Sequence, residues 1–135
     1  MIRSLSHTTL FVLDQERAKQ FYVDKLGFEV KADQTMGGFR WLTVAPRAQT
    51  GIVLVLMPVG AGPRMDEAAA KALRGLVEKG ALVMGVLATA DCKKTHEELT
   101  AKGVQFLQPP SERPYGIEAL LRDDSGNVFS LTQRR

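Results

Sequence analysis

The feature that most constrains the fold of this chain is a pattern that occurs twice. An alternating apolar and polar segment at 5–12 is followed by Asp14 at a helix N-cap position, an amphipathic stretch, and Gly27 at a helix end. The same order returns around Asp91 and Gly103. The two aspartates are 77 positions apart and the two glycines 76. This match predicts two copies of one strand, helix and strand plan.

The length of 135 residues predicts a single domain built from two half-modules. We expect the modules at 1–60 and 81–135, joined by a helix at 64–80 that follows a glycine and proline cluster. Further strands are expected at 39–44, 52–58, 104–107, 117–122 and 128–133. Pro109 and Pro110 are expected to break the chain after the third of these. Asp123 opens a turn that joins the last two strands into a hairpin.

Composition narrows the function classes. A hydrophobic fraction of 44% without an apolar run of membrane-spanning length indicates a globular protein, and no membrane partner is expected. The net charge of +3 is small and its cations are scattered, which argues against nucleic-acid binding. Because the first residues lead directly into a strand, we expect no secretory segment and a cytoplasmic location. Cys92 is the only cysteine, so no internal disulfide can form, and we expect it to pack beside a helix cap.

Several motifs together resemble the vicinal oxygen chelate superfamily, which includes glyoxalase I, bleomycin-resistance proteins, fosfomycin-resistance enzymes and extradiol dioxygenases. The motifs are the segment from His7 to Asp14, the run at 21–28 (FYVDKLGF), the Gly103-Val104 pair, and the RDDSGN turn at 122–127. The resemblance covers nearly the whole chain. It implies an α+β fold in which two βαβββ modules form a cupped mixed sheet around a cavity, and often a homodimer.

The resemblance also implies where a divalent metal would bind in catalytic members. Carried over by position, the four ligand places fall on His7, Val55, Gly85 and Ser130. Only His7 is a usual ligand, since valine and glycine have no side-chain donor and a serine hydroxyl is a poor one. Stable sites use three or four ligands. We therefore predict no cofactor, and allow a divalent metal only at an atypical site.

Strand alternation predicts which side chains face the concave side. They are His7, Thr9, Phe11, Phe39, Trp41, Thr43, Val53, Val55, Met57, Gly85, Leu87, Thr89, Glu118, Leu120, Val128, Ser130 and Thr132. Most are apolar or aromatic, which is typical of a pocket for a small apolar or planar ligand. Trp41 could stack on that ligand, or it could serve packing or a dimer interface. Tyr115 could cover the cavity from a loop, or lie on a surface loop.

Glu118 and His7 are the candidate catalytic pair. A carboxylate on an apolar wall would have its pKa raised by desolvation, as suits a general base, and His7 could be its acid partner. The alternatives are that Glu118 pairs with Arg40 or Arg113 or faces solvent, and that His7 is a hydrogen-bonded wall residue.

Two functions follow from these observations. The first is a metal-free, bleomycin-resistance-like protein that binds a small, largely apolar or aromatic molecule. The second is a glyoxalase-like lyase or isomerase, or a dioxygenase-related enzyme, that uses Glu118 and His7 or an atypical metal site. The sequence leaves open whether the protein is an enzyme.

Overall fold

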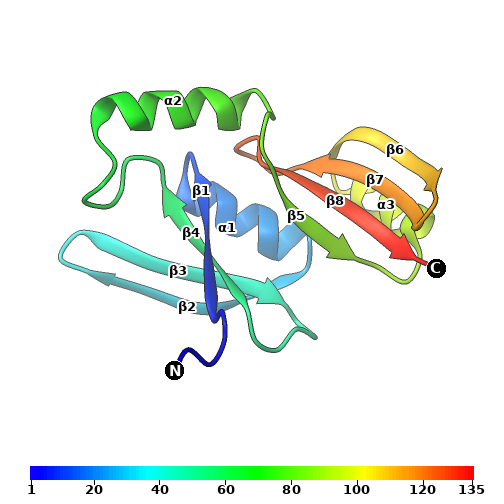
Figure 1. Cartoon of the computed structure of the whole chain (residues 1–135), viewed down its shortest axis with the longest axis horizontal. Helices are drawn as coiled ribbons and strands as arrows, with labels where there is room; N and C mark the ends of the chain where they lie inside the picture. Colours follow the sequence, from blue (N-terminus) through cyan, green and yellow to red (C-terminus); the bar gives the residue numbers. More distant parts are fainter. The chain divides into compact units, whose positions relative to one another are not determined.

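The computed structural model describes residues 1–135 and divides into two compact units, Met1–Arg74 and Gly75–Arg135. Each unit has the order strand, helix and three strands, which confirms two βαβββ modules in an α+β fold (Figure 1). The first unit contains β1 (His7–Val12), α1 (Gln15–Gln20), β2 (Phe28–Met36), β3 (Phe39–Pro46) and β4 (Val53–Pro58). The second contains β5 (Val83–Ala88), α3 (Cys92–Ala101), β6 (Gln105–Arg113), β7 (Gly116–Arg122) and β8 (Val128–Arg134). The helix α2 (Glu67–Glu78) contains the boundary between the units.

The repeated caps form as the sequence predicts. The Asp14 carboxylate accepts a hydrogen bond from the Arg17 amide at 2.9 Å, and the Asp91 carboxylate accepts one from the Lys94 amide at 3.0 Å. After α1 the chain continues as a π-helical turn, η1 (Phe21–Lys25), before Gly27 redirects it. Gly27 and Gly103 have φ angles of 75° and 89°, in the left-handed region that ends helices at little cost for glycine.

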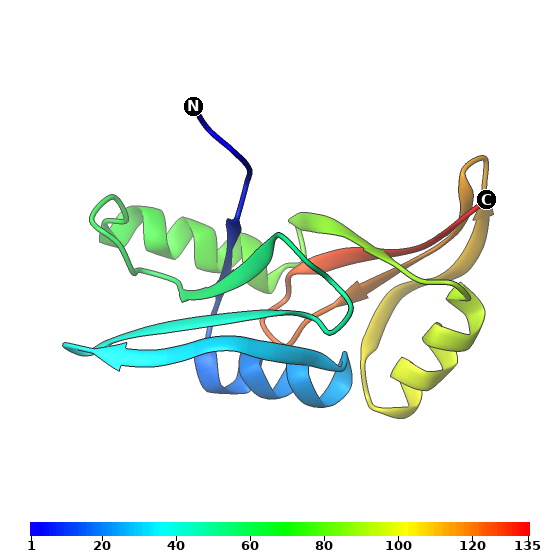
Figure 2. The same cartoon turned by 90° about the horizontal axis from the view of Figure 1, so that it is seen from below.

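The first sheet has the strand order β1-β4-β3-β2, in which β1 and β4 are parallel and the other pairs are antiparallel. Figure 2 shows α1 lying against one face of this sheet. The buried apolar side chains between helix and sheet are those of Leu10, Val12, Ala18, Phe21, Tyr22, Phe28, Leu42, Val44 and Leu56. The alternate residues of each strand lie on the opposite face, away from α1, and this face is called the open face below.

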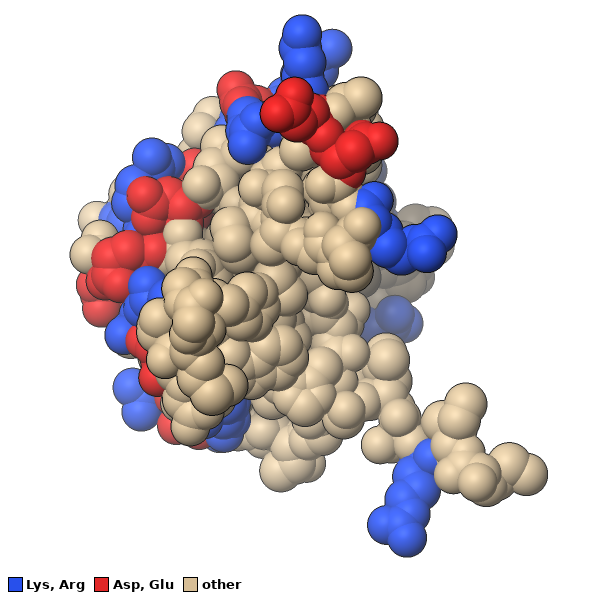
Figure 3. All heavy atoms as spheres, turned by 90° about the vertical axis from the view of Figure 1, so that its left-hand side faces the viewer, with Lys and Arg blue, Asp and Glu red and all other residues tan.

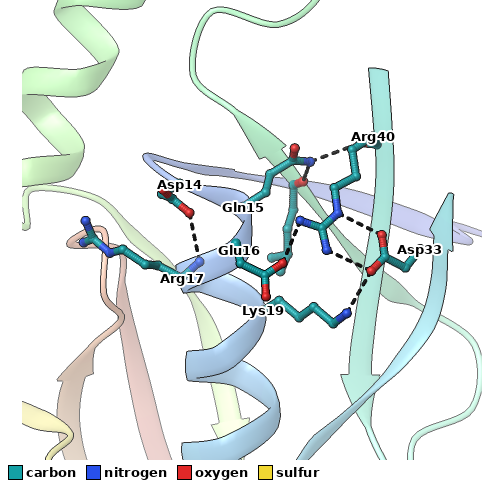
Figure 4. A network of polar contacts seen from close by, with 8 residues as sticks. Asp14, Gln15, Glu16, Arg17, Lys19, Asp33 and Arg40 are labelled. Atoms are coloured by element: carbon teal, nitrogen blue, oxygen red, sulfur yellow. Dashed lines mark hydrogen bonds and ion pairs between the residues drawn. The ribbon is translucent and has the colours of Figure 1, made fainter. Parts of the chain in front are cut away.

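Polar contacts join α1 to the sheet on its covered face (Figure 4). The Arg40 guanidinium donates to both carboxylate oxygens of Asp33 at 2.8 Å and to Glu16 at 3.0 Å, and Lys19 donates to Asp33 at 2.9 Å. These cations hold the pKa of Asp33 well below its usual value, with the Arg40 hydrogen bonds contributing most. The Gln15 amide donates to two strand carbonyls, at 2.8 and 3.1 Å. Arg40 is thus committed to α1 and β2, in the unit that does not contain Glu118.

The second sheet has the order β5-β8-β7-β6, with β5 and β8 parallel. The helix α3 packs on one face, against β6, β7 and β8. Its first residue, Cys92, is fully buried, and its thiol lies 3.4 Å from the Leu131 carbonyl oxygen. Burial raises the pKa of this thiol, and Cys92 is the packing residue that its position predicts.

The strand β6 corrects one expectation. It begins at Gln105 and continues through Pro109 and Pro110 to Arg113, although the prolines were expected to break it. It lies at the edge of its sheet, where a missing N–H costs no ladder hydrogen bond on the open side. Its pairing with β7 shifts register twice, between Phe106 and Ser111, where the prolines are accommodated.

The turn between β7 and β8 is built around one buried carboxylate. The Asp123 Oδ1 atom accepts from the backbone amides of Ser125, Gly126 and Asn127, each at 2.9 Å, and Oδ2 accepts from the Asn127 side chain at 3.0 Å. The structural role predicted for Asp123 is confirmed. No helix of the structure combines the length and the apolar character needed to cross a membrane.

Candidate functional site

The open face of the first sheet carries most of the residues that the sequence predicts for it. Between β1 and β4, Thr9 pairs with Val55 and Phe11 pairs with Met57. Between β3 and β4, Thr43 pairs with Val55, so all these side chains share one face. Alternation along β1, β3 and β4 places the remaining members on this same face, namely His7, Phe39, Trp41 and Val53. The face is mainly apolar and aromatic, with two threonines and one histidine as its polar members.

His7 and Trp41 lie close together on this face. Their ring centroids are 5.7 Å apart, with an angle of 47° between the ring planes. The Nδ1 atom of His7 also lies 2.9 Å from the Ser6 hydroxyl. An indole beside an imidazole at the exposed end of a sheet offers an aromatic surface to a planar molecule.

The open face of the second sheet is more polar. Register pairs Glu118 with Thr132 and Leu120 with Ser130, which places all four side chains on the face opposite α3. Ser130 and Thr132 are only 4% and 3% exposed. The sequence predicts this shared face correctly, because these two strands alternate without interruption.

In β5, by contrast, the predicted face is wrong. Gly85 pairs with Phe129 and Leu87 with Leu131, so both lie on the face covered by α3. A Cβ atom at Gly85 would stand 3.6 Å from the Phe129 ring, which confirms that orientation. Thr89 likewise lies on the helix side, since its hydroxyl is 2.7 Å from that of Thr95 in α3.

Met84 and Val86 replace these residues on the open face. Val86 pairs with Ser130, and the two apolar side chains are 40% and 61% exposed. The signal was present in the sequence, because an offset of 77 positions carries His7 onto Met84 and Thr9 onto Val86. A register shift between Val83 and Gly85 is the local reason that simple alternation fails here.

Glu118 lies at the centre of a hydrogen-bonded cluster. Its Oε2 atom accepts from the Ser130 hydroxyl at 2.8 Å, and its Oε1 atom accepts from the Tyr115 hydroxyl at 2.9 Å. The Arg113 Nε atom is 3.7 Å from Oε1, and the Ser130 and Thr132 hydroxyl oxygens are 2.6 Å apart. Of the two arginines considered as partners, Arg113 is the one that the structure places beside Glu118.

This cluster reverses the expected pKa shift of Glu118. The Ser130 hydrogen bond lowers the pKa most; desolvation raises it, and Tyr115 and Arg113 lower it further, so the net shift is downward. The same contact raises the pKa of Tyr115. The predicted upward shift of the Glu118 pKa is therefore wrong, and the role of Glu118 as a general base stays a prediction.

Two further predictions concern Tyr115 and His7. Tyr115 is bound within its own hairpin, between β6 and β7, and the residue as a whole is 44% exposed. A role for Tyr115 in covering a ligand stays a prediction. His7 and Glu118 belong to different units, and their action as an acid and base pair also stays a prediction.

The residues at the implied metal places do not fit a metal. Val55 is buried and apolar, Gly85 is on the helix side of its sheet, and the Ser130 hydroxyl is committed to Glu118. No group of three or more His, Cys, Asp or Glu side chains in the chain is arranged to hold a metal ion. We derive no chemical step through a metal at these positions.

Comparison with known proteins gives consistent matches over the whole chain. Residues 4–131 match the model of the Glyoxalase/Bleomycin resistance protein/Dioxygenase superfamily. The chain is 35% identical to the uncharacterized protein YurT of Bacillus subtilis, over 94% of this chain and 96% of that protein.

Two solved structures are also similar. UcmS2 is 47% identical with a TM-score of 0.91, covering 98% of this chain and 99% of that one. TnmS3, an antibiotic binding protein from Streptomyces sp. CB03234, is 33% identical with a TM-score of 0.78, covering 99% of this chain and 98% of that one.

Proposed function

Because the chain belongs to the Glyoxalase/Bleomycin resistance protein/Dioxygenase superfamily, we propose that it binds a small, largely apolar or aromatic molecule, of the kind that an antibiotic binding protein takes up. The observation that carries the proposal is the open sheet face that each unit presents, taken by itself. One face presents Trp41 and His7 among apolar side chains, and the other presents Glu118 with its hydroxyl partners. Apolar walls with a few fixed polar groups are typical of ligand sites.

The similarity to an antibiotic binding protein supports this proposal over an enzyme. The similarity to TnmS3 extends over nearly the full length of both chains. The side chains at the implied metal positions do not fit a metal. The pKa of Glu118 is lowered, whereas a general base needs a pKa near the working pH. Both observations favour binding without conversion.

We also propose that the protein works as a homodimer. Apolar side chains are exposed on the first unit, at Met1, Ile2, Leu5, Met36, Phe39 and Ile52. Figure 3 shows a broad area without charged side chains, with the Lys, Arg, Asp and Glu side chains gathered along its edges. Exposed apolar side chains and an area without charged side chains are both typical of an interface between subunits.

The proposal predicts that aromatic antibiotics change the fluorescence of Trp41, the only tryptophan. We expect a saturable change with one equivalent of ligand per chain, because the indole lies on the proposed ligand face. At a ligand concentration 100 times Kd, the bound protein should also be stabilised by about 2.7 kcal/mol, measurable as a rise in Tm. The Trp41→Phe variant, followed by calorimetry, controls for absorption by the ligand.

A flat titration and an unchanged Tm across a panel of aromatic antibiotics of different charge would contradict the proposed function. A linear, unsaturable quench that persists in the unfolded protein would contradict it as well.

A further inference from the structure

The hydroxyl protons around Glu118 can be assigned one by one. Ser130 has a single hydroxyl proton, and it donates that proton to the Glu118 carboxylate. The 2.6 Å contact between Ser130 and Thr132 must then use the Thr132 proton. Tyr115 donates its proton to the other carboxylate oxygen. All three hydroxyl protons therefore point inward, toward Glu118.

The cluster that results presents acceptors to its surroundings. An ionised carboxylate offers about four lone-pair positions, and the hydroxyls of Ser130 and Tyr115 fill two of them. The oxygens of Thr132 and Tyr115 retain lone pairs but have no free proton. Arg113, at 3.7 Å, offsets part of the charge without a short hydrogen bond to the carboxylate.

A second observation on the same face is independent of Glu118. Gln108 pairs with Leu120, and Leu120 pairs with Ser130, so these residues are neighbours across three strands. The side-chain nitrogen of Gln108 is buried and has no hydrogen-bond partner. A buried donor without a partner is costly, and a ligand hydroxyl can accept from such a donor with its oxygen while it donates its own proton to another group.

We infer that the open face of the second sheet is a polar subsite for a hydroxyl group on an aromatic or apolar molecule, with Glu118 as the acceptor of the hydroxyl proton. The inference rests on the proposed function and names the chemical class of its ligand. A ligand that presents a carboxylate or an ether oxygen to Glu118 would face the lone pairs of its carboxylate and is disfavoured at this position.

Three aromatic probes of nearly equal size test this inference: 2-naphthol, 2-methoxynaphthalene and 2-naphthoate. Binding is followed by titration of the isotope-labelled full chain, using the backbone amide NMR signals of Ser130 and Thr132. We expect the wild type to bind 2-naphthol about 10-fold more tightly than the methyl ether, because only the naphthol donates to an ionised acceptor. Binding of 2-naphthoate should be weaker than that of 2-naphthol.

The variant Glu118→Gln should reduce the preference for 2-naphthol to within about 2-fold, since its amide replaces a charged acceptor. The matched control is Glu112→Gln, which removes a carboxylate from the other face of β6, where Glu112 pairs with Arg135. This control should keep the wild-type preference for 2-naphthol. Glu118→Ala removes the acceptor altogether and should likewise abolish the preference for 2-naphthol, and this second variant serves if Glu118→Gln does not fold.

Equal affinity of the wild type for 2-naphthol and its methyl ether would overturn the inference and leave the proposed function intact. Tighter binding of 2-naphthoate than of 2-naphthol, or a preference unchanged in Glu118→Gln, would overturn it too. Failure of all three aromatic probes to bind the wild type would instead overturn the proposed function and the inference with it.

Discussion

Replacement of Asp123 by alanine is expected to lower the free energy of unfolding by about 3 kcal/mol or more, because three backbone amides lose their shared acceptor. Oδ1 of this carboxylate accepts from the amides of Ser125, Gly126 and Asn127. The side chain is only 3% exposed, so water cannot replace it without opening the turn. Urea denaturation followed by circular dichroism gives the difference.

The matched control is Asp91→Ala, which removes an aspartate that caps a single exposed amide at the start of α3. A lost N-cap costs about 1 kcal/mol. If the two alanine variants lose equal stability, the Asp123 carboxylate does not organise the turn as described.

The second large effect is expected for Gly126→Ala. Gly126 has φ 123°, and a Cβ atom there would stand 2.0 Å from the carbonyl oxygen of Val77, near the end of α2. Both the backbone conformation and the contact exclude a side chain, so the turn or the helix end must move. We expect a loss of about 3 kcal/mol in the free energy of unfolding, measured by urea denaturation.

Gly75→Ala is the control, and its expected effect on stability has the opposite sign. Gly75 lies in α2, the helix that also contains Val77. A Cβ atom at Gly75 meets nothing within 4 Å, and the residue is exposed in the interior of α2. Alanine there should stabilise the protein by up to about 1 kcal/mol. Equal effects of the two substitutions would show that Gly126 is not tightly packed against Val77.

The capped helices and the closing hairpin could be predicted because their signals are local. Asp14 and Asp91 each bind an amide three residues later, and Gly27 adopts the left-handed conformation expected at a helix end. The repeat distance then placed corresponding elements in both modules. Each of these features depends on a few neighbouring residues, which a sequence displays directly.

The faces of β5 could not be predicted by alternation alone. Every residue from Val83 to Ala88 is apolar or glycine, so the strand shows no polar side to identify solvent. A single register shift then inverts the face of the residues that follow it. Comparison with the first module would have corrected Gly85 and Leu87, because the repeat aligns Met84 and Val86 with the open face.

The direction of the pKa shift of Glu118 could not be predicted from the sequence for a different reason. Its apolar neighbours in β7 indicate desolvation, which raises a carboxyl pKa. The hydroxyls that reverse the shift come from Ser130, twelve positions away on β8, and from Tyr115 in the preceding turn. Hydrogen-bond geometry of this kind depends on register between strands, which the sequence specifies only indirectly.

Recovery of the bound molecule tests the central claim most directly. An aromatic antibiotic that binds in the Trp41 titration is incubated with increasing amounts of protein, the protein is unfolded, and the compound is identified by mass spectrometry. We predict that the retained amount saturates at one molecule per chain and that the compound is recovered chemically unchanged. Altered compound that accumulates with time, beyond the number of protein chains present, would contradict the account.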